Sequence, residues 1–297
     1  MSSNKHSNYL NDLNINNIKT RLLQNIGLKQ EDYEFYNIFV NDKDAIHVVI
    51  IDEINTLNVN IIKKDIIFLH GLTGTSMQYF RNFKKLSKYF RLIAMDLPGM
   101  GLSNRLGKVK QKEFDCLKAE EYFISRIKQA LYKLNINKFT FIGHSFGGYI
   151  ACLYAMSYPS NVESLILLSP VGISSHFIEY VSSKTEDIFQ KVMYNLNKPP
   201  TYGYQVIGKF AKSFFESILS NKLKGFDEGD DSKTFEELMK NVFKLKPTSE
   251  NLIYKFFNSS IQAYKPICYY FECFKDMKVD FIYGDSDWNP VQHAEEV

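Results

Sequence analysis

The stretch FIGHSFGGYIA, residues 141–151, places Ser145 between Gly143 and Gly147, where one apolar run ends and another begins. This is the pattern G-x-S-x-G. When it joins a strand to a helix, the tight turn strains the central residue, and backbone crowding requires tiny residues two positions before and after it. The serine hydroxyl is then exposed above the sheet edge, at the positive end of the helix. The pattern predicts a nucleophilic serine; the alternative is a glycine-flanked serine in an ordinary turn.

The segments around this stretch alternate between apolar strands and amphipathic helices. Strands are predicted at residues 45–52, 57–62, 65–71, 91–99, 138–145 and 162–170. Helices are predicted at residues 10–26, 77–90, 118–134 and 147–158. This alternation predicts an α/β fold with a mostly parallel sheet and helices on both faces. We expect the helix at 10–26 to pack on the domain; the alternative is an interfacial membrane helix.

The alternation stops between residues 171 and 278, where amphipathic helices such as 206–219 and 235–243 are predicted and no convincing strand is found. Residues 279–288, VDFIYGDSDW, restore the strand pattern, which indicates a helical insertion into one sheet. We therefore predict four parts along the chain. They are an N-terminal helical extension (1–44), a first core part (45–170), a helical cap or lid (171–278) and a second core part (279–297).

An activated serine needs donors that hold the developing oxyanion. One predicted donor is the backbone N–H of Phe146, the residue after the nucleophile. The other is the N–H of Leu72 in LHGLTG (69–74), where His70 and Gly71 end an earlier strand. The alternative for His70 and Gly71 is a plain strand-ending turn.

The acid partner is expected after the strand at 279–288, because the order along the chain is serine, acid, histidine. Asp287 is favoured since it lies beyond the tight turn at Gly284, and Trp288 would then form a wall of the site. Asp285 is the second candidate, with turn capping as its other role. Asp96, which also ends a strand, is expected to organise a loop.

The base is harder to place among the six histidines. His293 alone follows Asp287, but it is predicted to lie inside a helix. The side chain of His144 is expected to point into the core, and His70 is expected to line the site although it precedes the nucleophile. The sequence therefore predicts a serine, an oxyanion hole and an acid without a convincing base.

Composition excludes several classes of protein. The net charge of +3 and the absence of a basic run argue against nucleic acid as a partner. The four cysteines fit no zinc pattern, so no metal and no cofactor are expected, and Cys152 is predicted to be a buried thiol. The polar N-terminus has no signal-peptide pattern, and no apolar run is long enough to span a bilayer. We expect a cytoplasmic protein that could lie peripherally on membranes or lipid droplets.

Four stretches resemble the α/β-hydrolase fold: FLHGLTGTSMQYFRNF, FRLIAMDLPGMGLSNR, FIGHSFGGYIACLYAMSYPSNVESLILLSPVGI and VDFIYGDSDW. Within that fold they are most similar to the group of CGI-58, its plant homologues and the yeast lysophosphatidic acid acyltransferase and cardiolipin lipase relatives. The resemblance implies acyl chemistry on lipid esters with Ser145 and Asp287. Some animal members carry asparagine at the nucleophile position, whereas this chain keeps serine.

Members of this group also carry an H-x-x-x-x-D stretch that supplies the histidine, and it is absent here. The resemblance thus predicts either a degenerate member or a chain whose last strand, helix and histidine lie beyond residue 297.

Three functions remain open at this point. The first is a serine hydrolase or acyltransferase on a lipid or lysophospholipid ester, which the aromatic-rich insertion favours because aromatic faces in a lid suit an acyl chain. The second is a non-catalytic lipid-binding or lipase-regulating protein, which the absent histidine would allow. The third is another serine hydrolase such as a proline-type aminopeptidase. Epoxide hydrolases and haloalkane dehalogenases use a carboxylate where Ser145 stands and are disfavoured.

Overall fold

A computed structural model describes residues 13–42, 44–53, 62–104, 109–175, 229–258, 261–285 and 287. Its strands form one sheet in the order β1-β2-β4-β3-β5-β6-β7. Their bounds are β1 Tyr33–Phe39, β2 Ala45–Ile51, β3 Lys64–Leu69, β4 Phe90–Met95, β5 Phe139–His144, β6 Val162–Leu168 and β7 Lys278–Ile282. Strand β2 is antiparallel to both β1 and β4, and all other neighbours are parallel. The predicted mostly parallel sheet is confirmed.

The α-helices are α1 Leu13–Asn25, α2 Phe80–Leu86, α3 Cys116–Lys133, α4 Phe146–Ser157, α8 Asp230–Phe243 and α9 Ile253–Phe256. Short 3-10 helices are η1 Gln30–Asp32, η2 Ser76–Tyr79, η3 Gln111–Glu113, η4 Pro159–Asn161, η5 Ser249–Leu252 and η6 Ile267–Phe274. The helices predicted at residues 10–26, 118–134, 147–158 and 235–243 correspond to α1, α3, α4 and α8. The helix predicted at 77–90 is divided between η2 and α2. The helix predicted at 206–219 and most of the strand predicted at 57–62 lie outside the described residues.

The sheet starts earlier than the sequence analysis predicted. Residues 33–39 were assigned to a helical extension, but they form β1, which pairs antiparallel with β2 from Tyr33 opposite Ile51 to Phe39 opposite Ala45. The segment YEFYNIF alternates inward and outward side chains, and Tyr33 is buried whereas Phe39 is exposed. Pairing along the full length of β2 provides the backbone partners that make this segment a strand.

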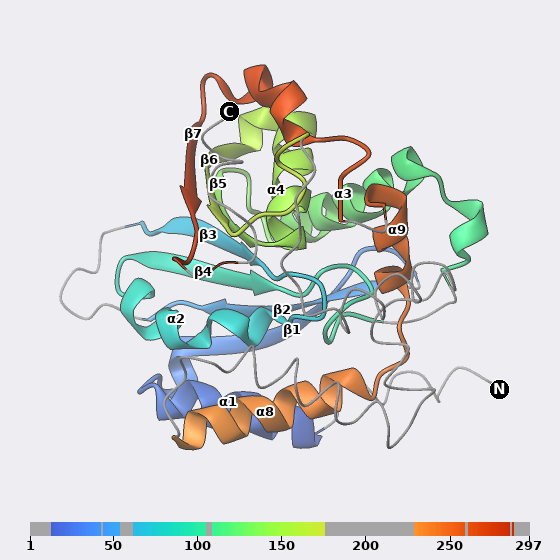
Figure 1. Ribbon diagram of the computed structural model, residues 1–297. Coiled ribbons are helices and arrows are strands. Elements are labelled where there is room, and N and C mark those ends of the chain that lie inside the picture. Colours follow the sequence, from blue (N-terminus) through green and yellow to red (C-terminus); the bar gives the residue numbers. More distant parts are fainter. Residues whose placement is uncertain are drawn as a thin grey trace.

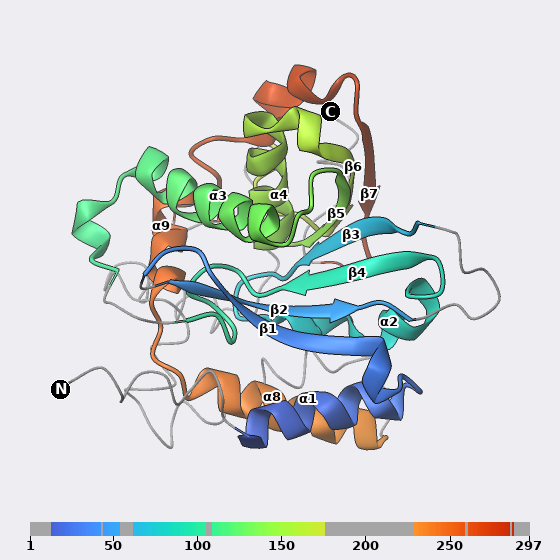
Figure 2. The same ribbon diagram turned by 180° about the vertical axis from the view of Figure 1, so that it is seen from behind.

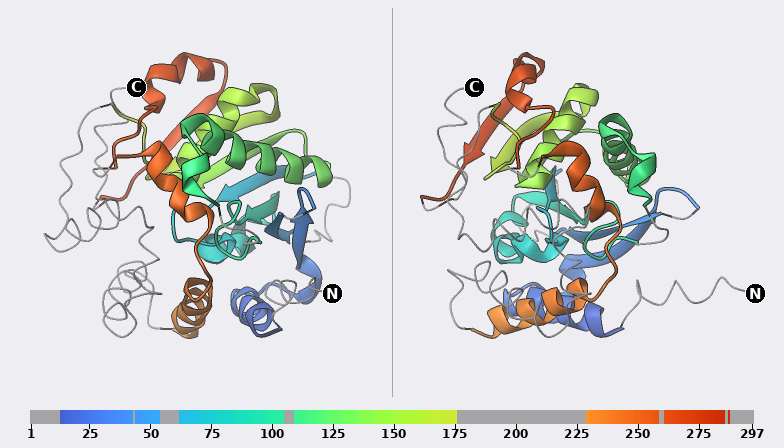
Figure 3. Two further views of the ribbon diagram at one scale, coloured as in Figure 1. Left: turned by 90° about the vertical axis from the view of Figure 1, so that its right-hand side faces the viewer. Right: turned by 45° about the vertical axis from the view of Figure 1, so that its right-hand side comes forward.

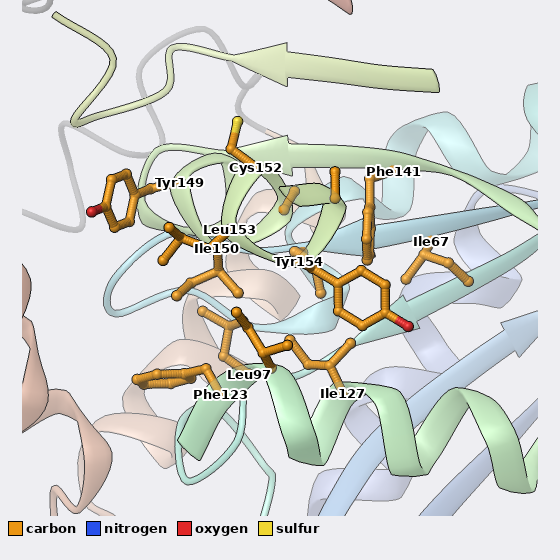
Figure 4. Close-up of a cluster of buried hydrophobic side chains, with 14 of the residues drawn as sticks. Ile67, Leu97, Phe123, Ile127, Phe141, Tyr149, Ile150, Cys152, Leu153 and Tyr154 are labelled. Atoms are coloured by element: carbon orange, nitrogen blue, oxygen red, sulfur yellow. The ribbon is translucent and has the colours of Figure 1, made fainter. Parts of the chain in front are cut away.

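Helices cover both faces of the sheet (Figure 1). On one face, α3 and α4 pack on alternate strand residues, and Figure 4 shows Phe123 and Ile127 of α3 facing Ile150 and Leu153 of α4. Helix α4 is the central element of this layer, because every residue from Phe146 to Ala155 is buried. Each large apolar side chain removed from water here contributes about 1.5–3 kcal/mol to stability.

On the opposite face, α1, α2 and α8 cover the other strand residues in a second core. Helix α8 falls within the stretch predicted to form a cap, yet its apolar side packs along α1, and the two helices lie side by side in Figures 1, 2 and 3. The Phe235 ring of α8 also stacks on Phe80 of α2, with centroids 5.7 Å apart. The assignment of residues 171–278 to a cap stays a prediction, because residues 176–228 lie outside the described part of the chain.

The strand order reverses direction at β3 and β5. From β3 the chain crosses to β4 on one side, and it later returns to place β5 on the other side of β3. In open α/β sheets, ligands bind in the crevice at the carboxyl ends of the strands where the order reverses. The loops after β3 and β5 contain His70, Gly71, Leu72 and Ser145, so these four residues lie at the position where the strand order reverses.

Candidate active site

Ser145 occupies a strained turn between β5 and α4. Its φ of 53° and ψ of −120° lie outside the regions that residues with a side chain normally adopt. The Ser145 N–H donates to the Leu168 carbonyl at 3.0 Å, and its carbonyl accepts from the N–H groups of Gly148 and Tyr149 at 3.0 and 3.2 Å. These bonds hold a conformation that an isolated serine would leave. Ser145 is half-buried at the carboxyl end of β5.

The glycines around Ser145 are required by close backbone contacts. A Cβ on Gly143 would lie 2.6 Å from the Cα of Gly148. A Cβ on Gly147 would lie 2.5 Å from the carbonyl oxygen of His70 and would also clash with the Leu69 carbonyl. Both contacts are with main-chain atoms that cannot rotate away. Gly147 therefore lets the end of β3 approach the start of α4, and Gly143 lets β5 approach the same helix.

The loop after β3 turns directly onto the serine. The Gly74 N–H donates to the Gly71 carbonyl at 2.9 Å, and Thr73 has a φ of 63°, so residues 71–74 form a tight turn. A Cβ on Gly71 would lie 3.0 Å from the Ser145 Cβ. Leu72 is the next residue in the chain after Gly71. Phe146 is the first residue of α4, so the N–H of Phe146 has no hydrogen-bond partner within that helix. The arrangement suits the two predicted oxyanion donors.

His70 lies beneath this loop and does not line the site. Its ring is fully buried, with Nδ1 at 2.7 Å from the Gly71 carbonyl and Nε2 at 2.9 Å from the Leu97 N–H. Because Nε2 accepts from an N–H, the ring is neutral and carries its proton on Nδ1, where it donates to Gly71. The expectation that His70 lines the site is wrong. Both nitrogens are used to join the loops after β3 and β4.

Asp96 organises the same loops, as the sequence analysis expected. Its carboxylate accepts from the Ser76 N–H at 2.5 Å and from the Leu102 N–H at 3.0 Å. Complete burial raises the pKa of Asp96 to about 6. The start of η5 also binds the loop after β4, since the hydroxyls of Thr248 and Ser249 donate hydrogen bonds to the carbonyls of Gly99 and Pro98.

Asp287 lies beyond the carboxyl end of β7, after a turn in which its N–H donates to the Gly284 carbonyl at 3.1 Å. Its Oδ2 accepts a hydrogen bond from the Ser169 hydroxyl, at the end of the neighbouring strand β6. Asp287 is half-buried, whereas Asp285 is exposed. The geometry therefore favours Asp287 over Asp285 as the acid. Ser169 was not among the predicted site residues, and no motif in the sequence identifies it.

The described histidines are His47, His70 and His144. His47 is buried in strand β2, where Nε2 lies 2.9 Å from Lys19 Nζ and Nδ1 lies 3.1 Å from the Asn37 side-chain oxygen. His144 is half-buried beside Gln78, with 3.0 Å between Gln78 Nε2 and His144 Nδ1, rather than in the core as expected. His6, His176, His293 and Trp288 lie outside the described residues. The missing base stays a prediction.

Other predicted features can be compared with the described part of the chain. Cys152 is buried, which confirms that prediction, and burial raises the pKa of its thiol to about 12. No group of three or more histidine, cysteine or acidic side chains within the described ranges could hold a metal ion. Of the helices described, none combines the length and the apolar character needed to cross a bilayer.

The sheet, the strained serine on its strand-to-helix turn and the loops around it define a class of protein, and a family comparison agrees. A family model described as alpha/beta hydrolase fold matches residues 65–292. The chain belongs to the α/β-hydrolase fold family.

Individual relatives place it near the group that its motifs suggest. A probable 1-acylglycerol-3-phosphate O-acyltransferase of Oryza sativa is 27% identical over 247 residues, which cover 78% of this chain and 58% of the relative. The 1-acylglycerol-3-phosphate O-acyltransferase ABHD5 (CGI-58) of Rattus norvegicus is 34% identical over 110 residues, which cover 37% of this chain and 30% of the relative. The chain thus spans less than two thirds of the length of these relatives.

Solved structures show the same fold. A bacterial membrane phospholipase A has a TM-score of 0.62 and 17% identity, with 96% of this chain and 79% of that chain covered.

Proposed function

We propose that this protein is a serine hydrolase or acyltransferase that takes the acyl group of a lipid carboxylic ester onto Ser145. The observation that carries this proposal is the Ser145 backbone conformation, φ 53° and ψ −120°, held between β5 and α4. A structural serine gains nothing from such strain. In a hydrolase the strain lifts the hydroxyl out of the sheet edge toward a bound ester.

In the proposed mechanism, Ser145 Oγ attacks the ester carbonyl carbon while a histidine takes the hydroxyl proton. The N–H groups of Leu72 and Phe146 hold the oxyanion of the tetrahedral intermediate. The intermediate collapses to an acyl-serine, and the leaving alcohol takes the proton from the histidine. Water or a second alcohol then accepts the acyl group, which distinguishes hydrolysis from transfer. Asp287 orients the histidine, which is neither His47, His70 nor His144 in this scheme.

The lipid nature of the substrate is inferred from the relatives, two of which are named for acyl transfer to 1-acylglycerol-3-phosphate. An acyl chain needs an apolar surface near Ser145 and a route from a lipid phase. We therefore propose a lipid or lysophospholipid ester as substrate and a peripheral contact with membranes or lipid droplets.

A fluorescent fluorophosphonate probe tests the proposed nucleophile, because it reacts covalently with activated serines. We expect labelling of the wild type, loss of labelling in Ser145→Ala, and unchanged labelling in Ser160→Ala, an exposed serine near the end of α4. Turnover of acyl esters of increasing chain length would then define the acyl preference. A folded wild-type protein that takes up no probe contradicts the proposal.

A second candidate is a non-catalytic lipid-binding or lipase-regulating protein of the same fold. One observation favours it: His47 and His70 use both ring nitrogens elsewhere, and His144 faces Gln78. This candidate predicts that wild type and Ser145→Ala bind lysophospholipid vesicles equally well and that neither reacts with the probe.

A further inference from the structure

We propose that Ser169 is a positioning residue that holds the carboxylate of Asp287 at the active site. This inference rests on the proposed function and adds a residue that the sequence pattern does not identify. Ser169 follows the last residue of β6, between the strand that leads to Ser145 and the strand that leads to Asp287. It therefore lies where one residue can contact both halves of the site.

Ser169 binds the Asp287 segment through its main chain and its side chain. Its N–H donates to the Ile282 carbonyl at 2.8 Å, which extends the pairing of β6 and β7 by one step. Its hydroxyl donates to Oδ2 of Asp287. Two bonds from one residue fix both the place where the chain leaves β7 and the rotation of the carboxylate. A bond from a hydroxyl to a carboxylate is stronger than one between neutral groups.

The residues on either side of Ser169 hold the nucleophile. The Leu168 carbonyl accepts from the Ser145 N–H at 3.0 Å, and the Val171 N–H donates to the Ser145 carbonyl at 3.4 Å. The intervening Pro170 packs so closely on α4 that a Cβ on Gly148 would lie 3.0 Å from its ring. The segment 168–171 thus connects Ser145 to Asp287 through four hydrogen bonds.

The conformation of Ser169 agrees with a positioning role. Its φ is 43°, in the left-handed region where a residue with a side chain is strained and glycine is favoured. A serine at this φ costs conformational free energy that a glycine would not, and the hydrogen bond to Asp287 offsets that cost. A second hydroxyl near Asp287 belongs to Tyr283; it is buried and makes no hydrogen bond within the described part of the chain. Ser169, rather than Tyr283, therefore orients the carboxylate.

The test compares Ser169→Ala with Ser169→Gly. Both variants remove the hydroxyl, but glycine also relieves the positive φ. We expect both to lower the rate of fluorophosphonate labelling by about tenfold or more, since both lose a charge-assisted hydrogen bond. If strain alone made Ser169 important, Ser169→Gly would label at least as fast as the wild type, and that result would overturn the proposal. Ser164→Ala is the matched control, because it removes a β6 hydroxyl that bonds Thr140 at 2.8 Å, away from the site.

The pH profile of labelling separates positioning from general loosening. A carboxylate held against the imidazolium stabilises that charged form and raises the pKa of the histidine. Loss of the Ser169 hydroxyl releases the carboxylate from this position. The acidic limb of the profile is therefore expected to move to lower pH in Ser169→Ala. A rate that falls equally at every pH, with no shift of the limb, would contradict the proposal.

A stability cycle tests the contact independently of activity. Urea midpoints are measured for wild type, Ser169→Ala, Asp287→Asn and the double variant. Coupled residues give midpoint shifts that do not add, whereas independent residues give shifts that do. If the wild type takes up no probe, the proposed function fails, and this cycle still decides whether Ser169 holds Asp287; additive shifts would overturn the inference.

Discussion

The backbone N–H of Leu97 donates to Nε2 of His70 across 2.9 Å, and this bond joins the loop after β4 to the loop that carries Leu72. Because His70 Nδ1 also donates to the Gly71 carbonyl, one buried ring connects both loops to the turn facing Ser145. The histidine at the start of the loop that carries Leu72 therefore has a supporting function. It is unavailable as the base.

Replacement of His70 by alanine should consequently destabilise the fold. The change leaves the Leu97 N–H buried without its partner, at about 1–3 kcal/mol. It also removes one of the two donors to the Gly71 carbonyl, which keeps the Gly74 N–H, and leaves a cavity where the buried ring was. We expect the free energy of unfolding to fall by roughly 2–5 kcal/mol, measured by urea denaturation. His144→Ala is the control, because His144 is half-buried and should lose about 1 kcal/mol. A His70→Ala protein with wild-type stability and no labelling would instead identify His70 as the base.

The two glycines after Phe146 are expected to differ in their tolerance of a methyl group. A Cβ on Gly147 would lie about 0.5 Å closer to main-chain oxygens of β3 and the following loop than a Cβ on Gly148 would lie to its neighbours, which are the Pro170 side chain at 3.0 Å and the Gly143 carbonyl oxygen at 3.1 Å. We expect Gly147→Ala to lower stability by about 3 kcal/mol or more and to abolish labelling. Gly148→Ala should stay within about 1 kcal/mol of the wild type, since alanine also favours the helix. Thermal unfolding measures both, and equal losses would show that the β3 contact is unimportant.

Much of the core and of the serine turn could be predicted because local patterns specify them. Apolar runs separated by helical spacing place β3 to β6 in the chain, and the glycines around Ser145 report a backbone contact that only small residues allow. The packing partner of an amphipathic helix could not be predicted, because periodicity shows which side of the helix is buried but not which element covers that side. Helix α8 was therefore predicted to belong to a cap, although it packs on α1.

Long-range contacts account for the other differences. Strand β1 depends on pairing with β2, and its short alternating segment resembles many exposed loops. Ser169 has no pattern of its own, since its importance comes from a bond to a residue 118 positions away. The role of His70 could not be predicted because a histidine after a strand fits a catalytic site and a loop support equally well.

A buried lysine provides a further prediction about stability. Lys19 of α1 is almost fully buried, with Nζ 2.9 Å from His47 Nε2 and 4.0 Å from the centroid of the Phe35 ring. Burial lowers the pKa of Lys19 to about 7, although the charge of Asp96 opposes this shift. Burial, together with Lys19, also lowers the pKa of His47 well below its usual value, so His47 is neutral.

The Lys19 pKa sets the sign of a pH effect. Between about pH 7 and pH 10.5 the unfolded chain binds more protons at Lys19 than the folded protein, so the stability of the wild type should rise with pH in this window. Relative to Lys19→Met, it should gain up to about 1.4 kcal/mol per pH unit between pH 7.5 and 9.5. Denaturant unfolding at several pH values measures this difference. Lys29→Met, at an exposed lysine, should show a constant difference from the wild type, and a constant difference for Lys19→Met as well would mean that Lys19 titrates normally.

The two aspartates after β7 are expected to have different effects on the reaction. Asp287 accepts the Ser169 hydroxyl at the same sheet edge as Ser145, whereas Asp285 is exposed, so we propose that Asp287 rather than Asp285 orients the histidine. Asp287→Asn keeps the shape but removes the charge that stabilises the imidazolium, and we expect fluorophosphonate labelling to slow at least about 100-fold. Asp285→Asn removes the same charge two residues earlier and should label within about twofold of the wild type. If Asp285→Asn were the slower variant, the acid would be Asp285, and the Ser169 contact would support the loop rather than the chemistry.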